Sequence, residues 1–599
     1  MYQESKNYEF LNNFSVQKNL WKLIPFDTES EHLSLYLNQK YNVPTMLTPY
    51  LKRIGINKNN FKAFFESKIK DFFPDPYLFV DMEKTVLRLV DEIEKKRPIG
   101  IFGDYDVDGA TSAAMLHLFF NYCGLKSFIH IPDRFLEGYG PNIEALSDLV
   151  EKGSKLIITV DCGITSFEPL QAMKNTDIDV IIVDHHKPID DLPPAYSIIN
   201  PKRKDSNIGF EYLCAAGITF ILLVGLNREL KKRGFFKDIS EPNLINFLDM
   251  VALGTACDVV PLIDLNRSLV KNGLKVMFER KNIGLKSLSD ISNINSSPNL
   301  EVLNFSLGPR INAGGRIGSS KLGVNLLIEQ NEDNAKEISL KLDNLNNKRK
   351  LLTAKIELEA IGIVESEINE NQGKLPSIIL VASEEWHEGV VGIVASKLKD
   401  KYNRPACVIS ITENLCKGSG RSIPGVSLGS LFIKAVEEKI LLKGGGHDMA
   451  AGLSIKKDKI EDFRNFLNSN IKNLNKNIYN NDITNIAAIA SVSSCSFELA
   501  QWIEKLGPWG EGVPIPKFII ENSQIKNIKR FGINMEHISF TIFDNTGEIQ
   551  CKKFNILNTP LNKVLSNTSN KFFNILGILK IDSWNNRNRP EFQLLDIII

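Results

Sequence analysis

The chain has 599 residues, too many for one ordinary hydrophobic core, so we expect about three or four domains. Hydrophobic residues make up 43% and charged residues 24%, the balance of a soluble globular protein. The formal net charge of +1 neither supports nor excludes a nucleic-acid partner, because a near-zero total can hide a basic groove beside acidic faces.

Cysteine usage and the N-terminus indicate a protein that stays inside the cell. The eight cysteines are scattered without a C-x-x-C pair or zinc-ligand spacing, which favours reduced thiols in a cytosolic protein. The first residues, MYQESKNYEF, are polar and lack the apolar core of a signal peptide. The longest apolar stretch, residues 215–226, is too short to span a bilayer and favours a buried helix. We therefore expect a cytoplasmic protein without a membrane partner.

Strand and helix patterns alternate in the first large part of the chain, residues 76–330. Residues 1–75 precede it, mix short helical patterns with loops and show no recognisable site. From residue 98, short apolar runs that end in polar residues alternate with amphipathic stretches, which predicts βαβ units around a parallel sheet. The runs are nearly continuous, as expected of strands covered on both faces: PIGIFGDYD, SFIHIPDR, KLIITVDCG and VIIVDHH. A helical region follows, at about residues 215–286.

The rest of the chain predicts a long helix and two further domains. Residues 331–370 are rich in Lys, Glu, Leu and Ala, which predicts one helix, on the order of 55 Å long, between two globular parts. Residues 371–470 resume the strand–helix alternation of an α/β domain. Residues 471–599 begin with an Asn-rich linker, NLNKNIYNNDITN. They continue as short alternating segments typical of a small barrel of the oligonucleotide-binding type.

Acidic residues and histidines gather at the predicted ends of three strands in the first domain. Because ligand sites of open parallel sheets lie outside the carboxyl ends of the strands, these groups should converge. GDYDVDG, TVDCG and VDHH supply them: Asp104, Asp106, Asp108, Asp161, Asp184, His185 and His186. So many like charges need cations to neutralise them. Oxygen-rich ligands with one or two imidazoles suit Mn²⁺ or Mg²⁺, and a pair of such ions can activate water beside a phosphate.

Each motif has a simpler explanation when it is taken alone. D-x-D-x-D-G could be a calcium loop, but an EF-hand needs Glu at its twelfth position, where this chain has Met115. A single Asp at a strand end is more often a helix cap than a ligand, and adjacent histidines alone mean little. Three motifs in order, each ending a strand, favour a shared site instead.

The same motifs resemble those of the DHH phosphoesterase superfamily. GDYDVDG, VDCG and VDHH look like its motifs, and VALGTACDVVPL, which contains Asp258, is similar to a fourth. GPRINAGGR, WHEGVVGIVASKL, GGGHDMAAG and GPWGEGVPIPKF resemble the RecJ branch specifically. The resemblance covers about residues 98–520. It implies an α/β fold with a parallel-sheet DHH domain, a long helix, a DHH-associated α/β domain and a C-terminal oligonucleotide-binding barrel.

The resemblance also implies a catalytic site with two ions of Mn²⁺ or Mg²⁺. Carried over by motif, the metal ligands would be Asp106, Asp108, Asp161, His185 and Asp258. Asp104, Asp184 and His186 would be further ligands or would orient the others. Many relatives carry a His two residues before the first Asp of the motif, where this chain has Phe102. This difference implies that the first ion depends more on Asp104.

Arginines and glycines elsewhere in the chain suit the binding of a single strand. Such binding needs cations directed at phosphates, backbone donors and faces on which bases stack. By resemblance to RecJ, Arg134, Ser419 and Arg421 would hold the terminal 5′-phosphate, with GSGRS as a flexible anion cradle. The remaining candidates are Arg310 and Arg316 of RINAGGR, and His447, which follows three glycines and precedes an apparent small-residue helix.

Two aromatic residues of the WHEGVVG motif have no settled role. Trp386 and His387 could stack on bases, but Trp386 could equally belong to the core.

The features together imply a 5′-to-3′ exonuclease that acts on single-stranded DNA in repair and recombination and releases 5′-mononucleotides. The expected partners are single-stranded DNA, a single-strand-binding protein and a helicase, and we expect a monomer. Three alternatives stay open. A DHH enzyme for short oligonucleotides or cyclic dinucleotides would not need the barrel, and a DHH pyrophosphatase would not need the RecJ-like motifs. A non-catalytic replication scaffold would lack the carboxylates that this chain retains. Processivity and the preference between DNA and RNA are left open.

Overall fold

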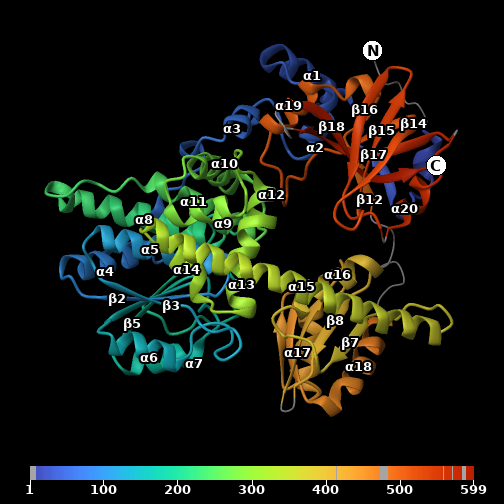
Figure 1. The fold of residues 1–599 in the computed structure, drawn as a ribbon. Helices are drawn as coiled ribbons and strands as arrows, with labels where there is room; N and C mark the ends of the chain where they lie inside the picture. Colours follow the sequence, from blue (N-terminus) through green and yellow to red (C-terminus); the bar gives the residue numbers. More distant parts are fainter. Residues whose placement is uncertain (1–7, 413–414, 473–482, 558, 570, 583–587) are drawn as a thin grey trace.

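The fold is known from a computed structural model, which describes residues 8–412, 415–472, 483–557, 559–569, 571–582 and 588–599. Two α/β domains flank one long helix, and a β-barrel lies beside the N-terminal helices (Figure 1). All eight cysteines are free, and seven of them are buried. Among the described helices, none has the length and apolar character needed to cross a membrane.

A five-stranded parallel sheet forms the centre of the first domain. Every residue of two of its three inner strands is buried, because helices cover both faces of the sheet. The sequence predicted four of the strands and missed β6, which has only three residues. In spatial order, the strands are β3 (Ser127–His130), β2 (Ile99–Gly103), β4 (Leu156–Val160), β5 (Asp179–Val183) and β6 (Ser197–Ile199).

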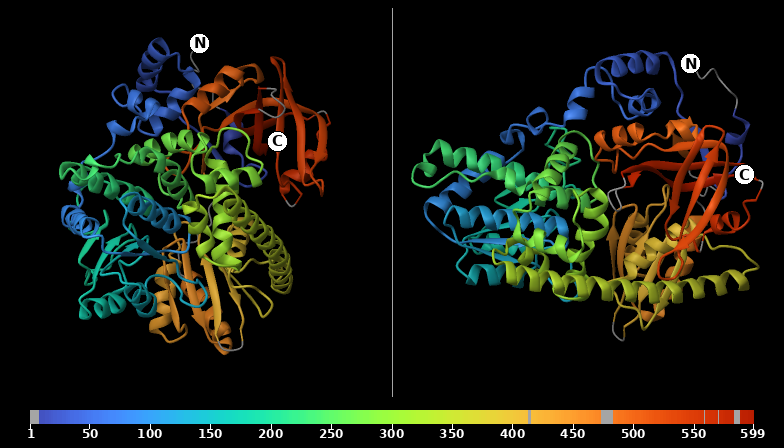
Figure 2. Two further views of the ribbon diagram at one scale, coloured as in Figure 1. Left: turned by 60° about the vertical axis from the view of Figure 1, so that its left-hand side comes forward. Right: turned by 45° about the horizontal axis from the view of Figure 1, so that its top comes forward.

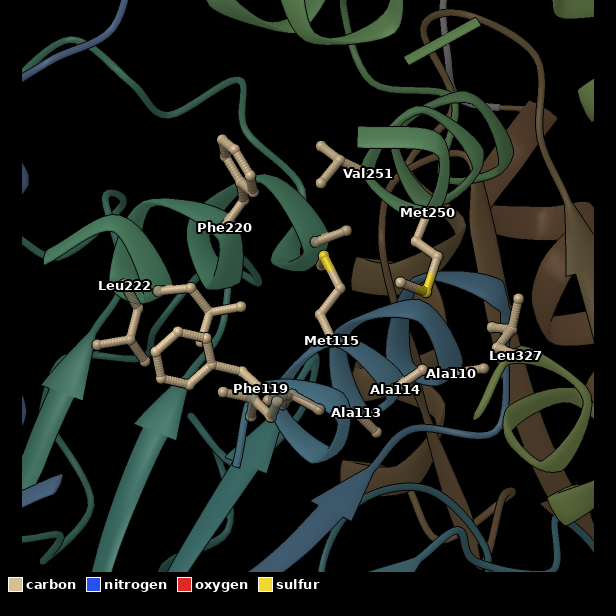
Figure 3. Packing of buried hydrophobic residues seen from close by; sticks show 14 of the residues in the cluster. Ala110, Ala113, Ala114, Met115, Phe119, Phe220, Leu222, Met250, Val251 and Leu327 are labelled. Atoms are coloured by element: carbon tan, nitrogen blue, oxygen red, sulfur yellow. The ribbon is translucent and has the colours of Figure 1, made fainter. Parts of the chain in front are cut away.

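Helices pack on both faces of this sheet. One face carries α6 (Ile143–Glu151) and α7 (Phe167–Asn175); the other carries α5 (Val107–Tyr122), α8 (Ala215–Lys232) and α9 (Leu248–Cys257). Helix α5 is buried on nearly all sides, and its Met115 and Phe119 lie among Phe220 of α8 and Met250 of α9 (Figure 3). Gly254 permits this close packing, since a Cβ there would lie 2.7 Å from the hydroxyl oxygen of Thr111.

Further helices lead to the second domain. They are α10 (Asp264–Phe278), α11 (Ile283–Ile291), α12 (Leu300–Val302), α13 (Gly308–Ile317) and α14 (Lys321–Ile328). The long helix α15 (Glu332–Glu370) follows, close to the predicted bounds, and begins where Asn331 accepts hydrogen bonds from Asp333 and Asn334. Leu342 belongs to the core of the first domain, whereas Ile356 belongs to a core of the second. The first half of α15 therefore packs against the first domain, and the second half packs against the second domain.

The second α/β domain contains a mixed five-stranded sheet. Its strands, in spatial order, are β10 (Lys443–Gly446), β11 (Ala450–Ile455), β9 (Cys416–Arg421), β8 (Ala406–Ser410) and β7 (Ile379–Ser383). Only β7 and β8 are parallel. Around the sheet lie α16 (Val391–Tyr402), α17 (Leu428–Glu437) and α18 (Ile460–Lys472).

Two local predictions in this domain were wrong. The GSGRS motif is part of β9, which is paired on both sides, and is not a flexible loop. The small residues after His447 begin strand β11 and not a helix. Tertiary packing explains both, because the glycines let neighbouring elements approach closely: a Cβ on Gly420 would lie 2.9 Å from the Phe432 ring.

The C-terminal part is a closed five-stranded barrel of the oligonucleotide-binding type. Each strand pairs with two others, in the order β14 (Phe518–Phe531), β15 (His537–Asp544), β16 (Gly547–Lys553), β18 (Arg589–Ile598) and β17 (Phe573–Asp582), and β17 returns to β14. Helix α20 (Pro560–Leu565) lies between β16 and β17 in the chain. A short strand, β13 (Ala488–Ala490), adds to β14, and α19 (Phe497–Lys505) follows it.

The N-terminal segment packs on this barrel, although it lies at the other end of the chain. Strand β1 (Leu20–Leu23) pairs in parallel with β12 (Ile483–Ile486), the strand before the barrel. Helices α1 (Thr28–Tyr41), α2 (Thr48–Arg53) and α3 (Phe61–Glu66) share one hydrophobic core with the barrel strands. Both views in Figure 2 show the N-terminal helices beside the barrel. Most of the predicted Asn-rich linker lies outside the described residues, and its last residues belong to β12.

Candidate metal and phosphate site

The acidic residues and histidines meet at the carboxyl edge of the first sheet, as predicted. Asp104 directly follows β2, Asp161 follows β4, and residues 184–186 follow β5. Asp258 reaches the same place from the end of α9. Asp161 adopts a left-handed backbone conformation, with φ of 63°, which turns the chain sharply at the end of its strand.

Two helix starts orient the remaining carboxylates. Asp106 caps α5, where its Oδ1 accepts hydrogen bonds from the N–H groups of Asp108 at 2.9 Å and Gly109 at 3.1 Å. The carboxylate of Asp108 accepts the first two N–H groups of α8, at 2.7 and 2.9 Å. A Cβ on Gly109 would lie 2.5 Å from the carbonyl oxygen of Asp104, so only glycine permits this tight turn.

These side chains form three overlapping groups that could each hold a cation. In each group, one ligand atom per residue lies within 4.8 Å of the others: Asp104, Asp106 and Asp161; Asp161, His185 and His186; and Asp108, His185 and Asp258. Asp161 and His185 each belong to two groups and thereby join all three. The arrangement therefore has room for more than one cation.

Buried atoms without partners indicate that cations complete the site. Five such atoms lack a hydrogen bond: Oδ1 of Asp104, Oδ1 of Asp161, Oδ2 of Asp258 and both ring nitrogens of His185. The Nε2 atom of His185 lies 3.2 Å from Asp161 and 3.5 Å from Asp258. Buried polar atoms normally have partners, so a group of orphaned oxygens and imidazole nitrogens fits Mn²⁺ or Mg²⁺.

The electrostatics of the carboxylates support the same conclusion. Burial, and then the neighbouring carboxylates, raise the pKa of Asp104 and Asp161 well above the ordinary value. The same causes raise the pKa of Asp108 to about 6 and that of Asp258 to about 8. Ionising all of these acids together is therefore unfavourable unless positive charge is bound among them.

Asp184 orients its neighbours and does not join the three groups. Its Oδ1 accepts the backbone N–H groups of His185 and His186 and the ring Nδ1–H of His186, the last at 2.8 Å. Burial alone would raise the pKa of Asp184, but the hydrogen bond and charge of His186 lower it to about 2. Burial likewise opposes the charge of His186, whose pKa the Asp184 contact raises to about 9. Burial lowers the pKa of His185 to about 3, which leaves a neutral imidazole.

Phe102 belongs to the sheet core and not to the site. Its side chain is fully buried in the core beneath α6 and α7 and stacks on His130, with ring centroids 5.4 Å apart. Asp104, two residues later, instead lies within one of the three groups.

Four arginines from three parts of the molecule gather beside this edge of the sheet. They are Arg134 after β3, Arg316 of α13, Arg349 of α15 and Arg421 of β9. Burial, and then the charges of the other three, lower the pKa of Arg316 to about 9. Within the described ranges, none of the four forms an ion pair with a carboxylate. We call these residues the arginine cluster. Unpaired guanidinium groups so close together favour a phosphate ligand.

Ser419 and the start of α16 border the arginine cluster. The Nη1 atom of Arg421 donates a hydrogen bond of 2.9 Å to the hydroxyl of Ser419. A Cβ on Gly392, in the first turn of α16, would lie 3.0 Å from that hydroxyl and 3.2 Å from Nη2 of Arg421. The positive end of the helix dipole therefore adds to the positive charge. Arg134, over the ring of Tyr105 at 5.1 Å, links the cluster to the metal site.

The other predicted substrate residues differ in their placement. Arg310 does not join the arginine cluster: it forms an ion pair of 2.8 Å with Asp343 of α15. His447 stacks on His186 with ring centroids 6.1 Å apart, which brings the second α/β domain to the metal site.

The two aromatic residues of WHEGVVG also differ. Trp386 is 3% exposed and donates a hydrogen bond to Glu359, so it belongs to the core. His387 packs edge-on against Phe135 of the first domain, at 5.7 Å.

Three residues near the site were not singled out from the sequence. The Tyr139 hydroxyl lies 3.3 Å from Nδ1 of His186, Lys202 interacts electrostatically with Asp258, and Arg349 joins the arginine cluster. Arg349 is the single arginine of α15 and lies among five lysines, so only the packing of the helix shows which cation faces inward. No motif distinguishes Lys202 or Tyr139.

Three family models match consecutive parts of the chain. The DHH family, N-terminal domain, matches residues 98–255; the DHHA1 domain matches residues 375–473; and the RecJ OB domain matches residues 486–596. The three matches follow the order of the parallel-sheet domain, the second α/β domain and the barrel.

Curated relatives are similar over most of the chain. The single-stranded-DNA-specific exonuclease RecJ of Bacillus subtilis is 34% identical over 94% of this chain and 69% of its own length. The RecJ proteins of Escherichia coli and Haemophilus influenzae are also 34% identical, over 80% and 79% of this chain and 85% and 83% of their own lengths.

Solved structures show the same fold. A structure of Thermus thermophilus RecJ with Mn²⁺ has a TM-score of 0.79 at 22% identity, and covers 97% of this chain and 79% of that chain. A structure of exonuclease RecJ bound to manganese has a TM-score of 0.57 at 28% identity, and covers 66% of this chain and 96% of that chain.

Proposed function

Because the chain belongs to the RecJ family of single-stranded-DNA-specific exonucleases, we propose that it degrades single-stranded DNA from the 5′ end and releases 5′-mononucleotides. It is a metal-dependent nuclease with Mn²⁺ or Mg²⁺ as cofactor. The observation that carries the polarity is the arginine cluster beside the metal site. A terminal phosphate bears more charge than an internal diester, so unpaired guanidinium groups there favour a 5′ end.

We assign the metal site to the residues whose ligand atoms converge. Asp106, Asp108, Asp161, His185 and Asp258 would hold two ions, and Asp104 would support the ion beside Asp106. When bound, such ions neutralise the phosphate and lower the pKa of water for attack on phosphorus. Asp184 holds the His186 ring in place through the hydrogen bond to Nδ1.

The remaining residues would position the strand. Arg134, Arg421 and Ser419 would hold the 5′-phosphate, with Arg316 adding charge from α13. His447, stacked on His186, would contact the strand from the second α/β domain. Displacement at the next phosphorus would release one 5′-mononucleotide and leave a new 5′-phosphate on the strand, ready for the next cycle.

The cellular setting is proposed from the same activity. A nuclease for single strands in DNA repair and recombination needs a helicase or resection to expose its substrate, and a single-strand-binding protein covers such strands. The eight free cysteines favour the reducing cytoplasm. We propose that the protein acts there as a monomer.

The test is digestion of one single strand that carries a label at either end, with Mn²⁺ present. The 5′ label should appear first as a mononucleotide, whereas the 3′-labelled strand should shorten step by step. A duplex of the same sequence with blunt ends is the control and should be resistant. Early release of the 3′ label would reverse the proposed polarity, and hydrolysis of dinucleotides alone would favour the short-oligonucleotide alternative.

A further inference from the structure

Lys202 lies on a rigid turn after β6, at the edge of the metal site. The side chain of Asn200 fixes this turn: its Nδ2 donates to the carbonyl oxygen of His186 at 2.9 Å, and its Oδ1 accepts the N–H of Lys202 at 2.8 Å. The next residue, Arg203, is buried and donates to Asp81 at 2.7 Å. The backbone on both sides of Lys202 is therefore fixed, and the turn is joined directly to residue 186 at the metal site.

The charge of Lys202 is unpaired but acts on the site. The side chain is half-buried, and its charge influences Asp184, Asp258 and His447, which come from three different segments. In the part of the chain that the structure describes, its ammonium forms no ion pair with a carboxylate. Lys204, two residues away, is exposed and pairs with Asp190 at 2.7 Å, as an ordinary surface lysine does.

The arginine cluster and Lys202 act on different acids of the metal site. The three groups of ligand atoms run from Asp104 to Asp258, joined by Asp161 and His185. The charge of Arg134 acts on Asp104, whereas the charge of Lys202 acts on Asp258. A strand whose 5′-phosphate lies in the arginine cluster would therefore cross the metal site toward Lys202.

We propose that Lys202 binds a phosphate of the DNA strand on the Asp258 side of the metal site. This inference rests on the proposed function, and it adds a contact that holds the strand beyond the scissile bond. An ammonium group on a flexible stem binds phosphate as a point charge, and a half-buried one gives a stronger contact than a solvated one. The phosphate supplies the negative partner that Lys202 lacks among the carboxylates of the described residues.

Salt dependence of binding tests the contact without relying on the metal-loaded enzyme. The full chain is titrated against a 3′-fluorescent 12-nucleotide single strand in EDTA, at several KCl concentrations, with fluorescence anisotropy as the readout. For single strands, each lost phosphate contact lowers the slope of log affinity against log salt by about 0.7. Lys202→Met should show this loss, Lys202→Arg should restore the slope, and Lys204→Met should match the wild type.

Steady-state kinetics with Mn²⁺ give a second readout. A charge-assisted contact that is equally strong in the bound ground state and in the transition state contributes to binding alone. Its loss should raise KM about tenfold or more, with little change in kcat. Lys204→Met should change neither value.

The outcomes separate this inference from the proposed function. If Lys202→Met keeps the wild-type slope and KM while the wild type degrades single strands, Lys202 only balances the nearby acids, and the inference is wrong. If the wild type neither binds nor degrades single-stranded DNA, the proposed function itself fails. Should Lys202→Met unfold in a thermal melt, Lys202→Gln, which keeps a polar end, is assayed in its place.

Discussion

Asp161 links two of the three groups of ligand atoms, so its removal should affect more than one cation. The carboxylate is almost fully buried, and its Oδ1 has no hydrogen-bond partner. Other acids of the site have a second role at a helix start, as Asp106 and Asp108 do. Asp161 makes no such contact through Oδ1, so substitution there should disturb the cation site more than the fold.

Asp161→Ala should abolish hydrolysis with Mn²⁺ or Mg²⁺ and should also abolish stabilisation by metal. Wild-type protein should gain about 2.7 kcal/mol of unfolding free energy when the free metal is about 100 times its Kd. Thermal melts with and without Mn²⁺ measure this gain, and circular dichroism checks the fold. Asp148→Ala, an exposed carboxylate on α6, is the matched control. Near-normal activity in Asp161→Ala would refute the two-metal assignment.

Arg421→Ala should weaken the preference for a 5′-phosphate more than it slows cleavage of a 5′-hydroxyl strand. Charge-assisted hydrogen bonds contribute about 1.5–3 kcal/mol, so kcat/KM on 5′-phosphorylated strands should fall by roughly 10- to 150-fold. Steady-state kinetics on matched oligonucleotides test this. Arg464→Ala in the same domain, where the arginine pairs with Glu367, is the control. An equal slowing on both substrates would make Arg421 a general backbone contact or a structural residue.

At the residue scale, motifs predicted which acidic residues and histidines converge, because strand ends of a parallel sheet lie at one edge. The residues at the ends of β2, β4 and β5 needed only that rule. Asp258 depended on the family resemblance, since by itself it is an acid after an apolar helix. Arg310 shows the limit of a motif: only the position of α15 reveals that Asp343 neutralises it.

At the scale of elements, α9 carries a buried carboxylate outside the metal site. Asp249, in the first turn, is 2% exposed, and its carboxylate accepts the N–H of Met250 at 2.7 Å. Burial raises its pKa to about 7. Because the folded-state pKa lies above the unfolded value, the folded protein favours the neutral carboxyl. Its contribution to stability is complete below about pH 4 and is lost as the pH rises to about 7.

Asp249→Asn should therefore stabilise the protein at alkaline pH and have little effect near pH 4. The pKa of Asp249 differs by about three units between the folded and unfolded states, which corresponds to a change in unfolding free energy on the order of 4 kcal/mol. Denaturant unfolding of both proteins at pH 4.5, 6 and 8 gives the pH profile. Asp148→Asn, at an exposed carboxylate of α6, controls for the change of net charge. A difference between Asp249→Asn and wild type that does not vary with pH would show that Asp249 is not titrating in this range.

Local patterns predicted the apolar and long elements better than the glycine-rich ones. The long helix α15 and the strands β2, β4 and β5 carry periodic or continuous apolar signals. Glycine-rich β9 and β10 lack side chains that would reveal a period. Their strand geometry comes from the ladder of neighbouring strands and from close contact with α17, such as Gly420 against Phe432. That information is tertiary and therefore invisible in a local pattern.

At the scale of the molecule, one buried arginine joins three parts of the chain. Arg267 of α10 is 2% exposed and donates to the carbonyl groups at the end of α19, including that of Gly507 at 2.9 Å. Its guanidinium also lies over the ring of Phe64 in α3, at 3.9 Å. The first α/β domain, the N-terminal segment and the segment between α19 and the barrel therefore meet at this residue. The partnership between the two ends of the chain was not predicted, because it follows from no local pattern.

Truncated proteins should show that the N-terminal helices depend on the barrel for their stability. Ending the chain after Lys472 leaves the apolar faces of α1–α3 without the barrel, so this protein should aggregate or unfold. Residues 68–472 alone should stay soluble and cleave short oligonucleotides, with weaker binding to long strands, because the barrel adds contacts but no metal ligand. Light scattering and kinetics on strands of different length test both. Equal loss on short and long strands would mean that the barrel stabilises the catalytic domain itself.

The shared core of the two chain ends also has a consequence for synthesis on the ribosome. Gln17 bonds to Asp596, which lies 579 residues later. At about 5–20 residues per second, roughly 30–120 s separate the emergence of these partners. During that time the apolar faces of α1–α3 have no barrel to cover them, whereas the first α/β domain can already fold. The nascent N-terminal segment should therefore bind holdase chaperones until the barrel has emerged and folded, and the enzyme's yield should depend on them.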